Sequence, residues 1–225
     1  MPATLEEGIA EKNTAAPAAR KMTFEEFINW AVKQEFSYEW VDGMVVPKFS
    51  RTGTEEEGVS MAAAPGSHGE LLWLLGAILR IWVRRHHLGW VMGPEFAMKL
   101  DAQRRGREPD LLFVTADRMN LIRDNYLDGA ADMAVEIISS ESIGRDRGEK
   151  FVEYEAAGVR EYWLLDPIRQ QAEFYRLGDD RHYRLVSTEP DGIFRSQVIA
   201  GFWLRVEWLW NLPDEFEVLQ ELGIR

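Results

Sequence analysis

The apolar run Met133-Ala134-Val135-Glu136-Ile137-Ile138 constrains the fold most, because it contains a glutamate. Its length and its Val and Ile content are typical of a buried strand, in which Glu136 shares a face with Ala134 and Ile138. A carboxylate buried there must be paired, neutralised or bound to a metal, since desolvating an unpaired charge is costly. The sequence therefore predicts a polar site inside an otherwise apolar sheet.

A second apolar run, Leu111-Leu112-Phe113-Val114, follows Glu108-Pro109-Asp110 and predicts another buried strand. Asp110 and Glu136 are thus candidates to converge on one cation, with Lys150 as the counter-charge. Both acids also have simpler explanations. Asp110 could cap the turn after the proline, and Glu136 could form a buried ion pair with an arginine.

Three polar residues downstream, Asp146, Lys150 and Tyr154, stand four apart in a segment that we expect to be helical over residues 145–157. Such spacing places them on one face of the helix. The face could belong to the same site as Glu136. It could equally be a solvated surface on which Lys150 pairs with Asp146 or Tyr154.

Composition limits the chemistry that this chain of 225 residues can perform. It has no cysteine, so any metal site must use oxygen or histidine ligands. Lys and Arg total 26 against 38 Asp and Glu, a formal net charge of −12, which argues against broad coating of nucleic acid but not against a local basic cleft. The hydrophobic content of 46% supports one large core, and we predict a single domain over residues 21–210 between a flexible tail (1–20) and a C-terminal extension (211–225).

The order of local signals predicts an α/β (α+β) fold with a mixed central sheet flanked by helices and with additional β-hairpins. Thr23 and Glu26 form a capping box, Asp42-Gly43 is a hairpin turn, and Gly158 is a helix cap. We expect helices over 23–34, from a cap at Ser67 to about 87, over 117–127 and over 145–157; a polar loop over 50–60 and a polar turn over 101–108; and strands over 38–46, 90–92, 96–100, 110–114, 132–138, 162–165, 172–177, 182–186 and 202–206. Residues 90–138 are expected to form the middle of the sheet.

These motifs in this order resemble the Uma2-type restriction endonuclease family of the PD-(D/E)XK nuclease-like superfamily. The resemblance rests on Glu108-Pro109-Asp110, on Val135-Glu136-Ile137-Ile138-Ser139, on Asp146 with Lys150 and Tyr154, and on the segment from Gly158 to Pro167. It extends upstream to Tyr38-Glu39-Trp40-Val41-Asp42-Gly43 and covers about residues 21–210. It implies a restriction-endonuclease-like core.

The resemblance further implies a metal-dependent endonuclease that hydrolyses DNA phosphodiester bonds. Asp110 and Glu136 would hold Mg²⁺ or Mn²⁺, and Lys150 would assist the attacking water, with Asp146 and Tyr154 beside it. The superfamily pattern places a lysine two residues after the glutamate, where this chain has Ile138, so Lys150 takes that role from the next helix. His68 matches a position where the superfamily adds a further polar group, although it could be a surface residue.

Two other functions compete with this prediction. The acidic composition and the missing strand lysine also fit a catalytically inactive nuclease-fold binding or scaffold protein. A glycosidase that uses Asp110 and Glu136 as acid and base is a third reading, which would require a wide aromatic cleft between them.

We expect DNA as the substrate, a homodimer and no membrane association. Trp208 and Trp210 are candidates for the dimer contact. The longest apolar run, Leu71 to Val83, is interrupted by Gly76 and Arg80 and predicts a buried helix. Residues 1–20 show no secretory signal, so we expect a cytoplasmic protein.

Overall fold

A six-stranded mixed sheet forms the centre of the computed structural model, which describes residues 21–34, 37–48, 68–139 and 142–224. Strands β8 and β9 are parallel neighbours, and every other pair in this sheet is antiparallel. The strand order is β11 (Tyr183–Val186), β10 (Gln171–Leu177), β9 (Glu161–Asp166), β8 (Met133–Ile137), β6 (Leu111–Thr115) and β3 (Gly89–Met92).

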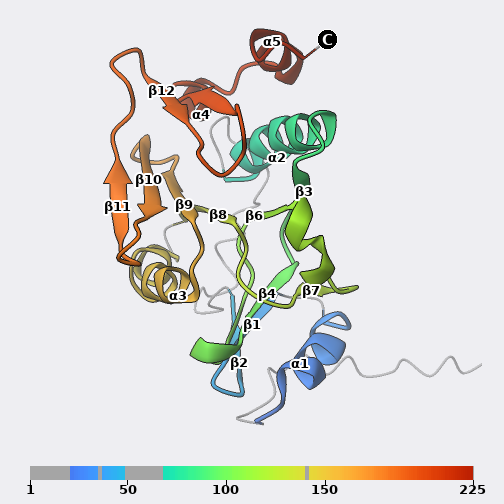
Figure 1. Ribbon diagram of the computed structural model, residues 1–225. Helices are drawn as coiled ribbons and strands as arrows, with labels where there is room; N and C mark the ends of the chain where they lie inside the picture. Colours follow the sequence, from blue (N-terminus) through green and yellow to red (C-terminus); the bar gives the residue numbers. More distant parts are fainter. Residues whose placement is uncertain (1–20, 35–36, 49–67, 140–141, 225) are drawn as a thin grey trace, which may run out of the picture.

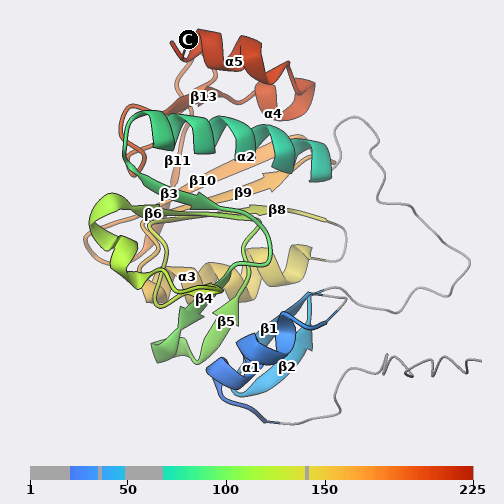
Figure 2. The same ribbon diagram turned by 90° about the vertical axis from the view of Figure 1, so that its right-hand side faces the viewer.

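Helices cover both faces of this sheet, as Figure 2 shows: α2 (His68–Arg85) lies above it and α3 (Phe151–Ala157) below. Alternate residues of each strand enter different cores, because successive side chains point to opposite faces. Phe113 and Val135 pack in the core that contains α2 residues, whereas Leu112 and Ala134 pack with α3 residues. Glu136 therefore lies on the face of α3, together with Ala134 and Ile138 as predicted.

A second, five-stranded sheet lies beside α3 in Figure 2 and is built largely from the N-terminal half of the described chain. Helix α1 (Phe24–Ala31) packs against it through Phe24 and Phe27, and the Phe24 ring meets Trp40 edge to face at 5.8 Å. Its order is β2 (Met44–Pro47), β1 (Tyr38–Val41), β5 (Arg105–Arg107), β4 (Ala97–Leu100) and β7 (Tyr126–Leu127).

The C-terminal elements cover α2 on the side away from the central sheet (Figures 1 and 2). They are β12 (Ile193–Arg195), β13 (Trp203–Arg205), α4 (Trp208–Asn211) and α5 (Glu215–Glu221). Val218 and Leu219 of α5 belong to the same core as α2, and so does Trp208, which is only 7% exposed. This burial in the chain's own core removes Trp208 as a surface for a dimer contact, while Trp210 is partly buried against the same core.

The local signals in the sequence are confirmed. Thr23 and Glu26 form the capping box, Asp42 and Gly43 connect β1 to β2, and Gly158 closes α3 with φ +89°. The predicted fold class is confirmed as well, since mixed sheets are flanked by helices.

Three expectations are wrong. Residues 117–127 are a short 3₁₀ segment (Ala116–Leu121) followed by β7, not a longer helix. The predicted polar turn over 101–108 contains β5, because distant acids neutralise its arginines. Residues 90–138 do not form the middle of one sheet: β3 is an edge strand of the central sheet, whereas β4, β5 and β7 belong to the second sheet.

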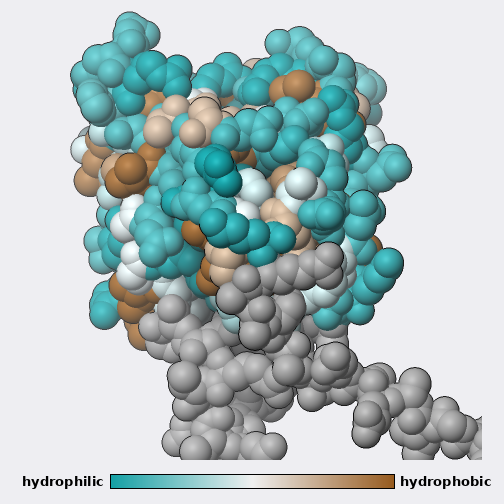
Figure 3. Space-filling view, turned by 90° about the horizontal axis from the view of Figure 1, so that it is seen from below, coloured by the Kyte–Doolittle hydropathy of each residue, from teal (hydrophilic) through white to brown (hydrophobic). Residues whose placement is uncertain are grey.

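Several expectations fall on residues outside the described ranges: the tail 1–20, the loop 50–60 and the cap at Ser67. Among the described helices, none has the length and apolar character needed to cross a bilayer. Hydrophilic residues dominate the described part of the face in Figure 3, with apolar residues scattered between them.

Candidate functional site

Asp110 stands directly before β6 and is bound across to β8. Its backbone N–H donates to the carbonyl of Val135 (3.1 Å), and its Oδ2 accepts the N–H of Ile137 at 2.7 Å. His68 Nε2, from the first turn of α2, lies 3.2 Å from the same oxygen, and Lys48 Nζ lies 3.7 Å from Oδ1. The carboxylate is thus fixed between the two strands that the sequence analysis singled out.

Glu136 is 2% exposed and is contacted by two of the predicted residues. The hydroxyl of Tyr154 donates to Oε1 at 2.8 Å, and Lys150 Nζ lies 2.8 Å from the same oxygen. The cationic partner of Glu136 is therefore Lys150, the predicted counter-charge, and not the arginine of the simpler explanation.

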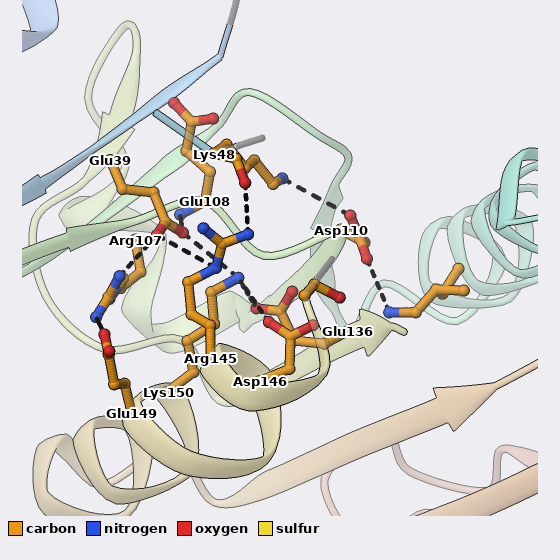
Figure 4. Close-up of polar contacts among 12 residues, drawn as sticks. Glu39, Lys48, Arg107, Glu108, Asp110, Glu136, Arg145, Asp146, Glu149 and Lys150 are labelled. Atoms are coloured by element: carbon orange, nitrogen blue, oxygen red, sulfur yellow. Dashed lines mark hydrogen bonds and ion pairs between the residues drawn. The ribbon is translucent and has the colours of Figure 1, made fainter. Parts of the chain in front are cut away.

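Lys150 is buried and lies at the end of a wide, π-type helical turn (Arg145–Lys150) that leads into α3. Such turns are frequent at functional sites. Asp146, on the same turn, places Oδ1 3.4 Å from the ammonium, so the predicted stripe is buried and not solvated. Figure 4 shows Glu136, Asp146 and Lys150 gathered beside this turn, with Asp110 opposite.

Glu39 and Arg107 complete the arrangement from the second sheet, and neither was among the predicted site residues. Glu39 Oε1 lies 3.4 Å from Lys150 Nζ, and Glu39 Oε2 accepts from Arg107 Nη1 at 2.6 Å. Arg107 also binds Glu153 and Glu149 (Figure 4 shows the latter). The signal for Glu39 was present, because a glutamate between Tyr38 and Trp40 in a strand poses the same burial problem as Glu136.

Burial and neighbouring charges shift the two central acids in opposite directions. Burial alone would raise the pKa of Asp110, but the bond to His68, the Lys48 ammonium and the Ile137 N–H lower it to about 2. Burial raises the pKa of Glu136 to about 8, with Asp146 and Asp110 adding to the rise and Lys150 opposing it. Asp110 is therefore firmly ionised, whereas Glu136 binds a proton readily.

Lys150 stays protonated. Burial opposes its charge, but the carboxylates of Glu136, Glu39 and Asp146 outweigh that effect and raise the pKa of Lys150 above its usual value. An ammonium held this way can donate hydrogen bonds and stabilise negative charge, but it cannot act as a general base.

A small cavity of about 20 Å³ joins these groups. Its volume suits a water molecule or an ion rather than a sugar ring, and its described lining contains no Phe, Tyr or Trp, which disfavours the glycosidase reading. The lining comprises the predicted His68, Asp110, Glu136, Asp146 and Lys150 together with Lys48, Ile137, Ser139, Ser142 and Arg145, which the sequence analysis did not select. Tyr154 is not part of this lining, but its hydroxyl binds Glu136.

The donor set suits a hard divalent cation. Besides the two carboxylates, the buried Ser139 Oγ and Asp146 Oδ1 accept or donate no hydrogen bond in the described structure. Within the described ranges no three Asp, Glu or His residues are grouped as a ready metal cage. Mg²⁺ does not require one, because it binds through one or two carboxylates and retains several waters.

Comparisons with known proteins give the fold and the family of the chain. No curated protein matches the chain. Among solved structures, a protein from Anabaena variabilis described as "a putative nuclease belonging to DUF820" superposes with a TM-score of 0.63 at 18% identity, covering 84% of this chain and 97% of that one. At this identity the match shows a common fold. The family model Uma2, described as "Putative restriction endonuclease", matches residues 24–207, and the chain therefore belongs to the Uma2 family.

Proposed function

We propose that the protein is a metal-dependent endonuclease that hydrolyses DNA phosphodiester bonds at the cavity between Asp110 and Glu136. The convergence of these two carboxylates and Lys150 on one cavity, from β6, β8 and the turn before α3, is the observation that supports it most. Family membership supports the nuclease class.

In this proposal Asp110 and Glu136 hold the cation, which is Mg²⁺ or Mn²⁺. When bound, the cation supplies Lewis-acid activation of water and neutralises charge on the phosphoryl oxygens. Asp110 is prepared for this role because His68 and the Ile137 N–H orient its carboxylate. Tyr154 fixes Glu136 in the same way.

Lys150 would orient the attacking water and stabilise the negative charge that develops on the phosphate. Its ammonium lines the cavity and lies 2.8 Å from Glu136 Oε1. Because it stays protonated, a proton released by the water must be accepted by another group, such as solvent or the phosphate itself.

Calorimetric titration with Mn²⁺ tests the metal site directly. We expect the native protein to bind and Glu136→Gln not to bind. The control Glu161→Gln, which replaces a buried glutamate of β9 that does not line the cavity, should bind as the native protein does. Binding must be accompanied by Mn²⁺- or Mg²⁺-dependent cleavage of DNA. Equal Mn²⁺ binding by Glu136→Gln would contradict the assignment.

Two observations favour the second candidate, a catalytically inactive nuclease-fold binding or scaffold protein. The 2.8 Å contact from Lys150 already compensates Glu136 without a metal, and the superfamily's strand lysine is replaced by Ile138. That function predicts no metal binding in the native protein.

A further inference from the structure

The ammonium of Lys150 is surrounded by three carboxylates, and one of them comes from a different sheet. Glu136 Oε1 lies at 2.8 Å, and Asp146 Oδ1 and Glu39 Oε1 both lie at 3.4 Å. An ammonium has three N–H donors, so each carboxylate can attract one. Asp146 belongs to the same helical turn as Lys150, whereas Glu39 belongs to β1 of the second sheet.

Strand alternation explains why Glu39 reaches the site. Tyr38 and Trp40 pack in the core formed with α1, so Glu39 between them points to the opposite side of β1. It is completely buried. The second sheet thereby delivers a carboxylate to a site that is otherwise built by the central sheet and its helices.

Glu39 is itself held firmly. Arg107 Nη1 donates to its Oε2 at 2.6 Å, Arg145 Nε lies 3.9 Å from the same oxygen, and Arg107 is in turn bound by Glu153 at 2.7 Å. Burial opposes ionisation of Glu39, but Lys150, Arg107 and the other cations outweigh it and lower the pKa of Glu39 to about 2. These contacts, drawn in Figure 4, hold its carboxylate in place.

We propose that Glu39 is a positioning residue that fixes the Lys150 ammonium in the cavity through a third carboxylate contact. With only Glu136 and Asp146 as partners, one N–H of the ammonium would lose its carboxylate, and the group could rotate and shift within the cavity. Glu39, from the second sheet, removes this freedom. The inference rests on the proposed function, because it concerns the same site.

The test follows the ammonium itself by ¹H–¹⁵N NMR on the full chain, with the Lys150 signal identified by its loss in Lys150→Arg. In the native protein we expect a slowly exchanging signal. Glu39→Gln should shift this signal and abolish its slow exchange, because one of the three carboxylates around the ammonium loses its charge. If Glu39→Gln does not fold, Glu39→Asp serves instead, since it keeps the charge but withdraws the carboxylate by one methylene.

Glu161→Gln is the matched control. Glu161 is also a completely buried strand glutamate, bound by Trp163 Nε1 at 2.9 Å and Ser196 Oγ at 2.8 Å. A purely structural effect of burying glutamine should therefore appear there too. We expect Glu161→Gln to lower thermal stability and to leave the Lys150 signal unchanged.

Cleavage kinetics supply the second readout. We expect kcat of Glu39→Gln to fall on the order of 100-fold with KM nearly unchanged, as for a catalytic group displaced by about 1 Å, and Glu39→Asp to be intermediate. An unchanged Lys150 signal in the folded Glu39 variant, or an equal shift in Glu161→Gln, overturns the proposal. A native protein that cleaves no nucleic acid would refute the proposed function, while the NMR measurement would still decide whether Glu39 positions Lys150.

Discussion

Two buried carboxylates lie at opposite ends of β8, and their surroundings differ sharply. Asp132, just before the strand, accepts the N–H and the hydroxyl of Thr115 at 2.7 and 2.9 Å, Arg118 Nη1 at 2.6 Å and Arg160 Nη2 at 2.7 Å. Glu136, within the strand, receives Tyr154 and Lys150 on a single oxygen.

The pKa shifts follow from these partners. Burial would raise the pKa of Asp132, but the Thr115 N–H and the arginines outweigh it and lower that pKa. At Glu136 burial prevails and raises the pKa to about 8. The comparison teaches that a buried acid in a strand is not by itself a sign of function. A carboxylate with saturated oxygens stabilises the fold, whereas one with remaining binding capacity can take a ligand.

The largest expected effect is a loss of DNA cleavage on changing Glu136, the acid within β8. Glu136→Gln should reduce metal-dependent DNA cleavage on the order of 100- to 1,000-fold, the loss typical of removing a group that acts on the transition state. Single-turnover cleavage by the folded variant measures this loss. Native-like cleavage by this variant would contradict a functional role of Glu136 that Asp132 lacks.

The opposite pattern is expected for Asp132→Asn. It should lower the free energy of unfolding by about 2 kcal/mol, less than the roughly 3–5 kcal/mol for a fully buried pair, because Arg118 and Arg160 reach solvent. Cleavage per folded molecule should be retained. Urea denaturation at pH 7 provides the measurement, and a stable but inactive variant would contradict a structural role.

The contributions of Glu136 and Asp132, at the two ends of β8, to the free energy of unfolding should depend on pH with opposite signs. Between pH 4.5 and about 8 folded Glu136 keeps a proton that the unfolded chain releases, so its contribution to stability falls as pH rises through this window. Asp132 stabilises the fold above its unfolded pKa near 3.8, and this contribution is lost as pH falls through the lower folded value. Urea denaturation of the native protein, Glu136→Gln and Asp132→Asn at several pH values measures these contributions. If both substitutions change the pH dependence of the free energy of unfolding in the same way, the predicted difference between the two acids is wrong.

The smallest effect is expected for Tyr154→Phe. This change removes the 2.8 Å hydrogen bond to Glu136 while keeping the buried ring, so unfolding should become easier by about 1 kcal/mol. Cleavage should fall about tenfold as Glu136 loses orientation. Tyr183→Phe is a suitable control, since its hydroxyl donates to the carbonyl of Val159 outside the site.

Much of the local structure could be predicted from the sequence. The capping box at Thr23, the Asp42-Gly43 hairpin and the Gly158 cap depend on residues within a few positions of one another, so they form wherever the chain is placed. The same applies to the face of Glu136, which strand alternation fixes. These local rules also selected Asp110, Glu136, Lys150, Asp146 and Tyr154 as candidates, while the family resemblance added His68.

Only the tertiary structure decided how distant segments meet. Sequence spacing could not assign β3 and β4 to different sheets, because strand pairing depends on long-range packing of both faces. It did not reveal that β5 is a strand, since the charge of Arg107 is compensated by Glu39 and Glu153, far away in the chain. The sequence by itself thus determined that a buried acid needed a partner and suggested Lys150, while the fold brought Lys150 within 2.8 Å of Glu136 and added Glu39 of a second sheet as a further partner of Lys150.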